Sequence, residues 1–267
     1  MILTWNSERY VEPCVRSVLG CSGIDASVAV VDNGSTDATP GMLRSLAAAH
    51  SEVRPVFLDK NLGTTVPRNI ALRNLPEGVE YVCVLDSDTV VNEKALLRMV
   101  DVLDGDPSIG VVGPAMRDSA GAVQQSGRNL PTLGIKLAKA LPGSNAQARG
   151  MRLEMPSSPI VDQLQDVPYL ISACWLVPVR VLERVGLLDE RIFYAPEDVD
   201  WCLRCRKAGY RVVWCHDAEI VHEYQRISKK LFFSRMNLEH LKGLAYYFRK
   251  HRYLLDVGKA LETEKRP

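Results

Sequence analysis

The sequence has 267 residues, 46% of them hydrophobic and 24% charged, which is enough to bury one large core or two modest cores that share an interface. Its 33 basic and 32 acidic side chains leave a formal net charge of +1, so no overall field attracts nucleic acid or another acidic polymer. Because apolar runs stay far below the roughly 20 residues of a membrane span and no signal-peptide pattern opens the chain, we expect a cytoplasmic globular protein.

The first half alternates short β-branched runs with helical patterns, which is typical of a parallel sheet with crossover helices. The expected strands are Ile2–Thr4, Ser27–Val31, Val53–Leu58, Tyr81–Leu85 and Gly110–Val112. The expected helices are Glu8–Leu19, Ala38–His50 with Ser35 and Asp37 as caps, Thr65–Leu75, and Glu93–Leu103 with Asn92 as cap.

From Arg128 to Asp166 the pattern gives way to Pro, Gly, Ser, Asn and Gln, with one short helix expected near Leu133–Leu141. Such a segment is either a lid or acceptor-binding loop, or disordered, and its composition favours neither. The elements expected after it are a strand at Val167–Leu176, helices at Pro178–Val185 and Glu197–Ala208, strands at Arg211–Cys215 and Glu219–His222, and a helix at Ser228–His251.

That last helix is both basic and amphipathic. Its apolar stripe can pack on the core, the interpretation we favour, or the helix can lie on a membrane surface. The second alternative would give the protein a peripheral contact with the inner face of the membrane.

Seven cysteines at irregular spacing fit reduced thiols better than a disulfide framework. Cys202 and Cys205 form a C-x-x-C pair, with Cys215 and His216 following, which suggests zinc. However, the pair falls within an expected helix, where its spacing suits one packed face, and the sequence has no second C-x-x-C. We therefore favour core packing.

Two carboxylates follow the apolar strand Tyr81–Leu85, at Asp86 and Asp88, separated by Ser87. Ligands bind at the carboxyl ends of strands in open α/β sheets, and paired carboxylates there can hold Mg²⁺ or Mn²⁺ together with phosphate oxygens. The alternative is an ordinary turn with Asp as a helix cap. Asp32, one unit earlier, likewise follows a buried strand, and Gly34 allows close approach of the backbone.

Three carboxylates, Glu197, Asp198 and Asp200, occupy the expected first turn of a helix. The helix dipole favours negative charge there, so simple capping is one explanation. Because a cap needs only one carboxylate, the excess suggests a general base that removes a proton from an acceptor hydroxyl. His222 ends a strand and could complete a metal site with Asp88, which would favour Mn²⁺ over Mg²⁺, although a lone histidine is commonly structural.

Several motifs in one order resemble the inverting glycosyltransferases of family two, which have the GT-A fold, over about residues 1 to 225. The resemblance is greatest to bacterial rhamnosyltransferase-like members. The motifs are ILTWNS at Ile2–Ser7, VVDNGSTDAT at Val30–Thr39, NLG at Asn61–Gly63, RN at Arg68–Asn69, LDSDT at Leu85–Thr89 and YAPEDVDWCLR at Tyr194–Arg204, followed by His222.

The resemblance implies a mostly parallel central sheet flanked by helices, a smaller acceptor-side sheet and a C-terminal helix. It divides the chain into a donor-binding half at 1–115, an acceptor-binding and catalytic half at 116–225 and a helical extension at 226–267. The implied nucleotide-binding residues are Thr4, Asn6, Asp32, Asn33, Arg68, Asp86 and Ser87. The implied metal ligands are Asp86, Asp88 and His222, and the implied catalytic pair is Glu197 and Asp198, with Asp198 as the base.

The implied partners are a UDP- or dTDP-sugar donor and a glycan or lipid-linked acceptor, for either a monomer or a homo-oligomer. The chain departs from the family at Pro67, where Ala is common, and in lacking a Gly-rich stretch after His222. A sugar-nucleotide pyrophosphorylase is disfavoured because the opening residues contain no Gly-rich loop, and a Rossmann dehydrogenase because no G-x-G-x-x-G follows the first strand. A catalytically inactive binding or scaffold protein with the same fold is the remaining alternative.

Overall fold

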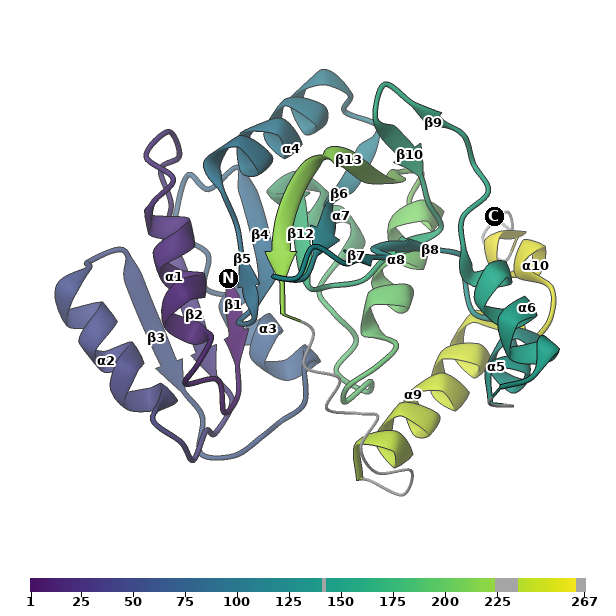
Figure 1. Cartoon of the computed structure of the whole chain (residues 1–267), viewed down its shortest axis with the longest axis horizontal. Coiled ribbons are helices and arrows are strands. Elements are labelled where there is room, and N and C mark those ends of the chain that lie inside the picture. The colour runs from purple at the N-terminus through teal and green to yellow at the C-terminus, as the bar shows by residue number, and fades with distance from the viewer. Residues whose placement is uncertain (141–142, 224–234, 263–267) are drawn as a thin grey trace.

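The β-branched runs of the first half form adjacent parallel strands, as the sequence predicts, in the order β3-β2-β1-β4. The structure is a computed structural model that describes residues 1–140, 143–223 and 235–262 (Figure 1). The chain leaves β1 toward β2 and β3 and returns on its other side as β4, which creates a switch point between β1 and β4. These strands and the helices that join them are β1 (Ile2–Thr4), α1 (Val11–Leu19), β2 (Val28–Asp32), α2 (Thr39–Ala49), β3 (Val53–Phe57), α3 (Thr65–Leu72) and β4 (Tyr81–Asp86).

The second half extends the same sheet. β12 (Cys174–Pro178) runs antiparallel between β4 and β6 (Ile109–Arg117), which follows α4 (Glu93–Gly105), and β13 (Arg211–His222) is parallel to β6. The short strands at its margins are β5 (Thr89–Val90), β7 (Val123–Gln124), β9 (Ile160–Val161) and β10 (Leu164–Asp166). A second sheet pairs β8 (Gly127–Arg128) with β11 (Tyr169–Leu170). The expected large, mostly parallel sheet with a smaller companion is therefore confirmed.

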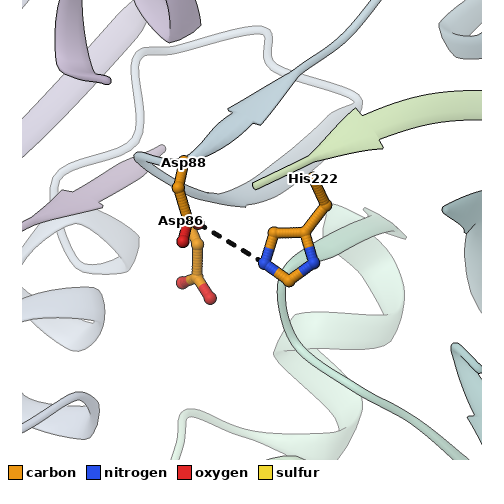
Figure 2. Close-up of side chains that lie close together, drawn as sticks. All are labelled: Asp86, Asp88 and His222. Atoms are coloured by element: carbon orange, nitrogen blue, oxygen red, sulfur yellow. Dashed lines mark ion pairs between the residues drawn. The ribbon is translucent and has the colours of Figure 1, made fainter. Parts of the chain in front are cut away.

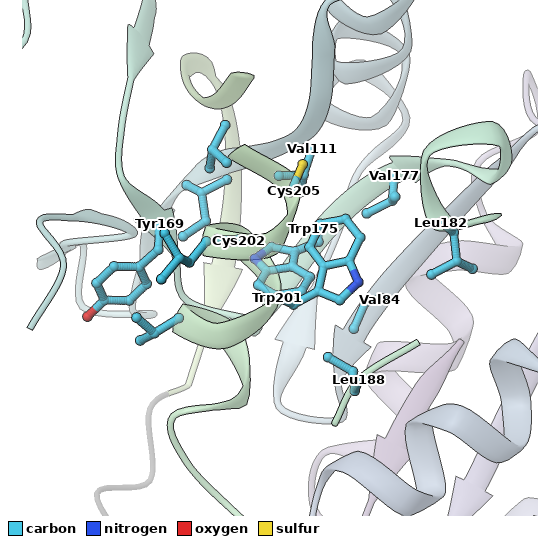
Figure 3. Packing of buried hydrophobic residues seen from close by; sticks show 14 of the residues in the cluster. Val84, Val111, Tyr169, Trp175, Val177, Leu182, Leu188, Trp201, Cys202 and Cys205 are labelled. Carbon is cyan, nitrogen blue, oxygen red and sulfur yellow. The ribbon is translucent and has the colours of Figure 1, made fainter. Parts of the chain in front are cut away.

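Hydrophobic cores fill both faces of the central sheet because side chains alternate along each strand. On β4, Val82 and Val84 face the cluster that contains Trp175 and Trp201, whose ring centroids lie 5.5 Å apart (Figure 3). Leu85 faces the opposite cluster, which α1, α2 and α4 cover. The sheet edge that carries the polar turns is thus fixed from both sides.

Between Arg128 and Asp166 the structure is more regular than the sequence suggests. The helix expected there is α5 (Leu133–Lys139), and the described residues add α6 (Asn145–Glu154) and strands β9 and β10. The small polar residues that we interpret as loop include helix caps, since the Thr132 and Ser144 hydroxyls accept hydrogen bonds from the Ile135 and Gln147 amides at 3.2 and 3.0 Å.

Strand boundaries farther along also differ from expectation. The single strand expected at Val167–Leu176 is two strands, because the chain passes from the small sheet at β11 to the central sheet at β12. Conversely, the two strands expected between Arg211 and His222 are one continuous strand with an irregular register between Cys215 and Glu219.

The last helices pack on the core of the second half. Cys202 and Cys205 are both fully buried on α8. On α9, Tyr247 is fully buried whereas Leu241 is 63% exposed, so the helix packs on the core with only part of its apolar surface. The first residues of the helix expected from Ser228 lie outside the described residues, and none of the described helices is long and apolar enough to cross a membrane. These helices are α7 (Val179–Val185), α8 (Glu197–Lys207), α9 (Arg235–His251) and α10 (Val257–Glu262).

Candidate active site

Polar side chains from three neighbouring strands meet at the switch point of the sheet. Thr4 is paired with Asp32 across β1 and β2, and Leu3 is paired with Asp86 across β1 and β4. Thr4 is 1% exposed, and its hydroxyl oxygen has no hydrogen-bond partner among the described residues. A buried hydroxyl without a partner is costly, so it is available to a ligand that reaches this edge.

The turns next to this edge are held by hydrogen bonds between side chains and backbone. The Ser35 hydroxyl donates to the Asp32 carboxylate and accepts from the Asn6 amide at 2.8 Å, so Ser35 does not cap α2. The buried Asn33 side chain donates to the Gly63 carbonyl at 2.7 Å and accepts from the Leu62 amide at 2.8 Å. Asn6 and Asn33 therefore shape the loops around the edge, and Asn33 joins the turn after β2 to the NLG motif.

Asp86, Asp88 and His222 form a cluster that could hold a metal ion (Figure 2). Strand β5 follows Asp88 directly, and its pairing with β13 places His222 opposite Thr89. His222 Nε2 consequently lies 3.4 Å from an Asp88 carboxylate oxygen, and one candidate ligand atom from each residue lies within 4.8 Å of the others. Two carboxylates and one imidazole suit Mn²⁺, and the carboxylates suit Mg²⁺.

Outer contacts fix the orientation of this cluster. His222 Nδ1 lies 2.7 Å from the Gln124 side-chain oxygen, which leaves Nε2 facing Asp88. Burial lowers the pKa of His222, but the hydrogen bond and charge of Asp88 outweigh it and raise the pKa above its ordinary value. Ser87, between the two aspartates, donates to the Ser7 hydroxyl at 2.9 Å. No motif in the sequence identifies Gln124 as a residue of the site.

A single buried arginine joins the D-x-D turn to the carboxylates of α8. Arg68, on α3, is 1% exposed, and its guanidinium lies 2.6 Å from an Asp86 oxygen and 3.0 Å from a Glu197 oxygen. It also donates to the Ser172 hydroxyl at 2.8 Å. Arg68 therefore lies between two acidic motifs that are more than 100 residues apart in the chain. Ser172, which sequence reasoning missed, belongs to no recognised motif.

The three carboxylates at the start of α8 have different surroundings. Burial, together with the charge of Asp198, raises the pKa of Glu197 to about 8 although Arg68 opposes the shift. Asp200 is fully buried and pairs with Arg204, Lys250 and His251 at 2.6 to 2.9 Å. Although burial acts against it, these contacts lower the pKa of Asp200 to about 2. Asp200 thus ties α8 to α9.

Of these three carboxylates, only that of Asp198 has no ion pair with another of the described residues. Its side chain is partly exposed and accepts a hydrogen bond from the Val199 amide at 2.8 Å. Burial raises its pKa, while the Val199 amide and the charges of Arg128, Arg68 and Lys136 oppose that shift. A partly exposed carboxylate with a raised pKa suits a general base.

Two glycines allow close backbone contacts that support α8. A Cβ on Gly63 would lie 1.9 Å from the Phe193 carbonyl oxygen, and a Cβ on Gly243 of α9 would lie 2.1 Å from the Ala195 carbonyl oxygen. Both contacts hold the segment just before Glu197. The NLG motif identifies Gly63 in the sequence, whereas Gly243 stands in an ordinary helical pattern.

Comparison with known proteins identifies the family of this chain. Residues 1–238 match the family model described as glycosyltransferase like family 2. The chain is 30% identical over 236 residues to the N-acetylglucosaminyl-diphospho-decaprenol L-rhamnosyltransferase of Mycobacterium tuberculosis, covering 82% of this chain and 74% of the relative. It is 26% identical over 196 residues to the dTDP-rhamnosyl transferase RfbF of Shigella flexneri, covering 73% and 59%.

Solved structures show the same fold. The mannosyltransferase PcManGT from Pyrobaculum calidifontis, in complex with GDP-Man and Mn²⁺, superposes with a TM-score of 0.60 at 19% identity, covering 93% of this chain and 62% of that one. TarS of S. aureus, in complex with UDP-GlcNAc, gives a TM-score of 0.55 at 19% identity, covering 82% and 56%. The chain therefore belongs to glycosyltransferase family 2, and it is a rhamnosyltransferase-like glycosyltransferase with the GT-A fold.

Proposed function

We propose that the enzyme transfers a sugar, with inversion and metal assistance, from a UDP- or dTDP-sugar to a hydroxyl of a glycan or lipid-linked glycan. The observation that carries the proposal is the Arg68 bridge, because its guanidinium contacts both Asp86 of the candidate metal cluster and Glu197, the neighbour of the candidate base Asp198. Two relatives are named rhamnosyltransferases, which supports a rhamnosyl donor. The name of the Mycobacterium tuberculosis relative includes a diphospho-decaprenol, which supports a lipid-linked acceptor.

The donor half would lie at the switch point of the sheet. Thr4, Asp32 and the loops shaped by Asn6 and Asn33 would line the nucleotide pocket, with Ser87 holding the D-x-D turn. Asp86, Asp88 and His222 would hold Mg²⁺ or Mn²⁺, and the ion would supply positive charge opposite the leaving diphosphate. Arg68 is buried between carboxylates, so we assign it the positioning of Asp86 and Glu197.

The acceptor half would lie over the start of α8. Asp198 would take the proton of the acceptor hydroxyl as its oxygen forms a bond to the anomeric carbon. The bond from that carbon to the diphosphate breaks on the opposite face, and its electron pair leaves with the nucleotide diphosphate. Glu197 would keep its contact with Arg68 and hold the first turn of α8 toward the donor.

A panel of UDP- and dTDP-sugars assayed with Mn²⁺ tests this function, because a matching donor gives transfer or slow hydrolysis. Nuclear magnetic resonance of the first-formed product then reports the anomeric configuration, which we expect to be opposite to that of the donor. Product with the donor's configuration, or full activity in the presence of a chelator, would contradict the proposed mechanism. Asp101→Asn, which alters an exposed side chain on α4, is the control for activity that is lost during preparation of a variant.

A further inference from the structure

A large groove is lined by residues of α5, of α9 and of the segment that leads into α10. Figure 1 shows where these elements lie in the fold. Its volume is about 980 Å³. Leucines on its wall are largely exposed: Leu137 by 61%, Leu241 by 63% and Leu255 by 70%. Contiguous apolar surface of this kind is uncommon on soluble proteins and marks a binding surface.

The same groove carries a strongly basic set of side chains. Lys136, Arg249, Arg252 and Lys259 line it, against one acidic residue, Asp256. Four cations around an apolar wall match a molecule that has a hydrocarbon part and an anionic part. They do not match a neutral glycan, which would need many hydrogen-bonding side chains along the wall.

The groove is linked to the candidate base by a short series of contacts. Lys136 of α5 lies 4.0 Å from one carboxylate oxygen of Glu154, and Arg128 of β8 lies 3.8 Å from the other. Strand β8 pairs Arg128 with Tyr169 of β11, which packs against α8. The Arg128 and Lys136 charges both act on Asp198 at the start of that helix. Of the basic residues that line the groove, Lys136 is therefore the one that these contacts join to the surroundings of the base.

We propose that this groove binds the hydrocarbon chain of a lipid-linked acceptor, while Lys136 and Arg128 hold its anionic phosphate or diphosphate. The acceptor sugar attached to that phosphate would then extend to Asp198. The inference rests on the proposed function, since it assigns the acceptor class of the same site.

The shape of the surface favours a single lipid chain over a flat membrane contact. A helix that lies on a bilayer presents its apolar face outward, whereas these leucines line a hollow between helices. The walls are also tied together, because the Leu133 amide donates to the Leu254 carbonyl at 2.7 Å and the Tyr253 hydroxyl donates to the Pro131 carbonyl at 2.9 Å. The hollow is therefore preformed.

Binding can be measured without turnover by titrating the protein with farnesyl diphosphate, inorganic pyrophosphate and farnesol. We expect farnesyl diphosphate to bind at least about tenfold tighter than pyrophosphate, since burial of the chain adds to the ionic contacts. Leu241→Gln should weaken its binding about tenfold. Leu238→Gln is the matched control, because Leu238 is on the same helix and 54% exposed but lies outside the groove.

A kinetic measurement extends the test to the reaction. With a long-chain diphosphate-linked acceptor, Leu241→Gln should raise the acceptor KM several-fold, and with a short water-soluble acceptor it should leave KM and kcat unchanged. Equal affinity for farnesyl diphosphate and pyrophosphate, or equal effects of the two glutamine variants, would overturn the proposal.

Two other occupants give distinct results that would also overturn it. Binding to anionic phospholipid vesicles without affinity for farnesyl diphosphate would indicate a membrane-docking face. A dimer in sedimentation that Leu241→Gln dissociates would indicate a second copy of the chain in the groove. If no donor sugar is used but farnesyl diphosphate binds as described, the proposed function fails while the lipid site stands.

Discussion

At the scale of single residues, one guanidinium organises two carboxyl groups of the site. Arg68 is 1% exposed and contacts both Asp86 and Glu197. A buried ion pair contributes little net stability, but removing one partner leaves an uncompensated charge in a poorly solvated place. Burial lowers the pKa of Arg68, but the charges of its two partners outweigh that effect and raise it, which keeps the side chain charged.

Replacing Arg68 with alanine should destabilise the protein by about 3 to 5 kcal/mol, because Asp86 loses its counter-charge and the buried Glu197 loses its hydrogen-bond donor. Arg73→Ala is the control at the end of the same helix. Its pair with Glu190 is half exposed and should contribute less than about 1 kcal/mol. Urea denaturation measures the free energy of unfolding of both variants. Equal decreases in the two variants would show that the Arg68 contacts do not stabilise the fold more than an exposed ion pair does.

Glu197 gives a pH dependence with a definite sign. Its pKa is about 8 in the folded protein, against 4.5 as its ordinary value, so the folded state keeps a proton that the unfolded chain releases. This contribution to stability is complete below about pH 4.5 and is lost as the pH rises to about 8, by on the order of 5 kcal/mol.

Glu197→Gln cannot ionise, so its free energy of unfolding should change less than that of the wild type between about pH 5 and about pH 8. Denaturant titrations at both ends of this range provide the measurement. Parallel pH profiles for the variant and the wild type would mean that Glu197 is already ionised in the folded state.

At the scale of elements, the sequence predicts most reliably where one local pattern decides the structure. The first four strands and their crossover helices are predicted because β-branched runs and polar turns alternate clearly. Helix α6 was missed because its residues are mostly polar and small, and its order depends on the Ser144 cap and on Glu154, which binds Lys139. Such tertiary contacts leave no periodic signal.

The contact of α9 with the segment before Glu197 is an element-level feature that mutation can test. Gly243→Ala would place a methyl group 2.1 Å from the Ala195 carbonyl oxygen, so α9 must shift. We expect a loss of about 1 to 3 kcal/mol. Gly41→Ala, in α2, meets no atom within 4 Å and should instead stabilise by about 0.5 to 1 kcal/mol. Thermal unfolding distinguishes the two, and a neutral Gly243→Ala would show that this contact is loose.

At the scale of the whole molecule, the topology accounts for the parts of the site that motifs reveal and the parts that they do not. Asp86, Asp88 and Asp198 stand in recognisable motifs, so the sequence alone identifies them as candidates. The link between the two motifs is Arg68, which contacts Asp86 and Glu197, and the position of His222 depends on the pairing of β5 with β13. The groove is assembled from helices whose individual patterns are unremarkable, so only the assembled fold reveals it.

The central claim is that one site combines a metal-dependent donor end with an acceptor base. The presence of both parts would distinguish an active enzyme from a scaffold protein that keeps only the fold. A scaffold that has lost catalysis need not bind a nucleotide diphosphate and Mn²⁺ together, whereas an active transferase should be stabilised by both.

The most direct measurement compares the wild type, Asp88→Asn and Asp198→Asn for both thermal stabilisation by UDP or dTDP with Mn²⁺ and sugar transfer. We predict that the wild type shows both properties, that Asp88→Asn loses both, and that Asp198→Asn keeps the stabilisation but loses transfer by about 10² to 10⁴-fold. Undiminished transfer by Asp198→Asn, or stabilisation of Asp88→Asn equal to that of the wild type, would contradict the account.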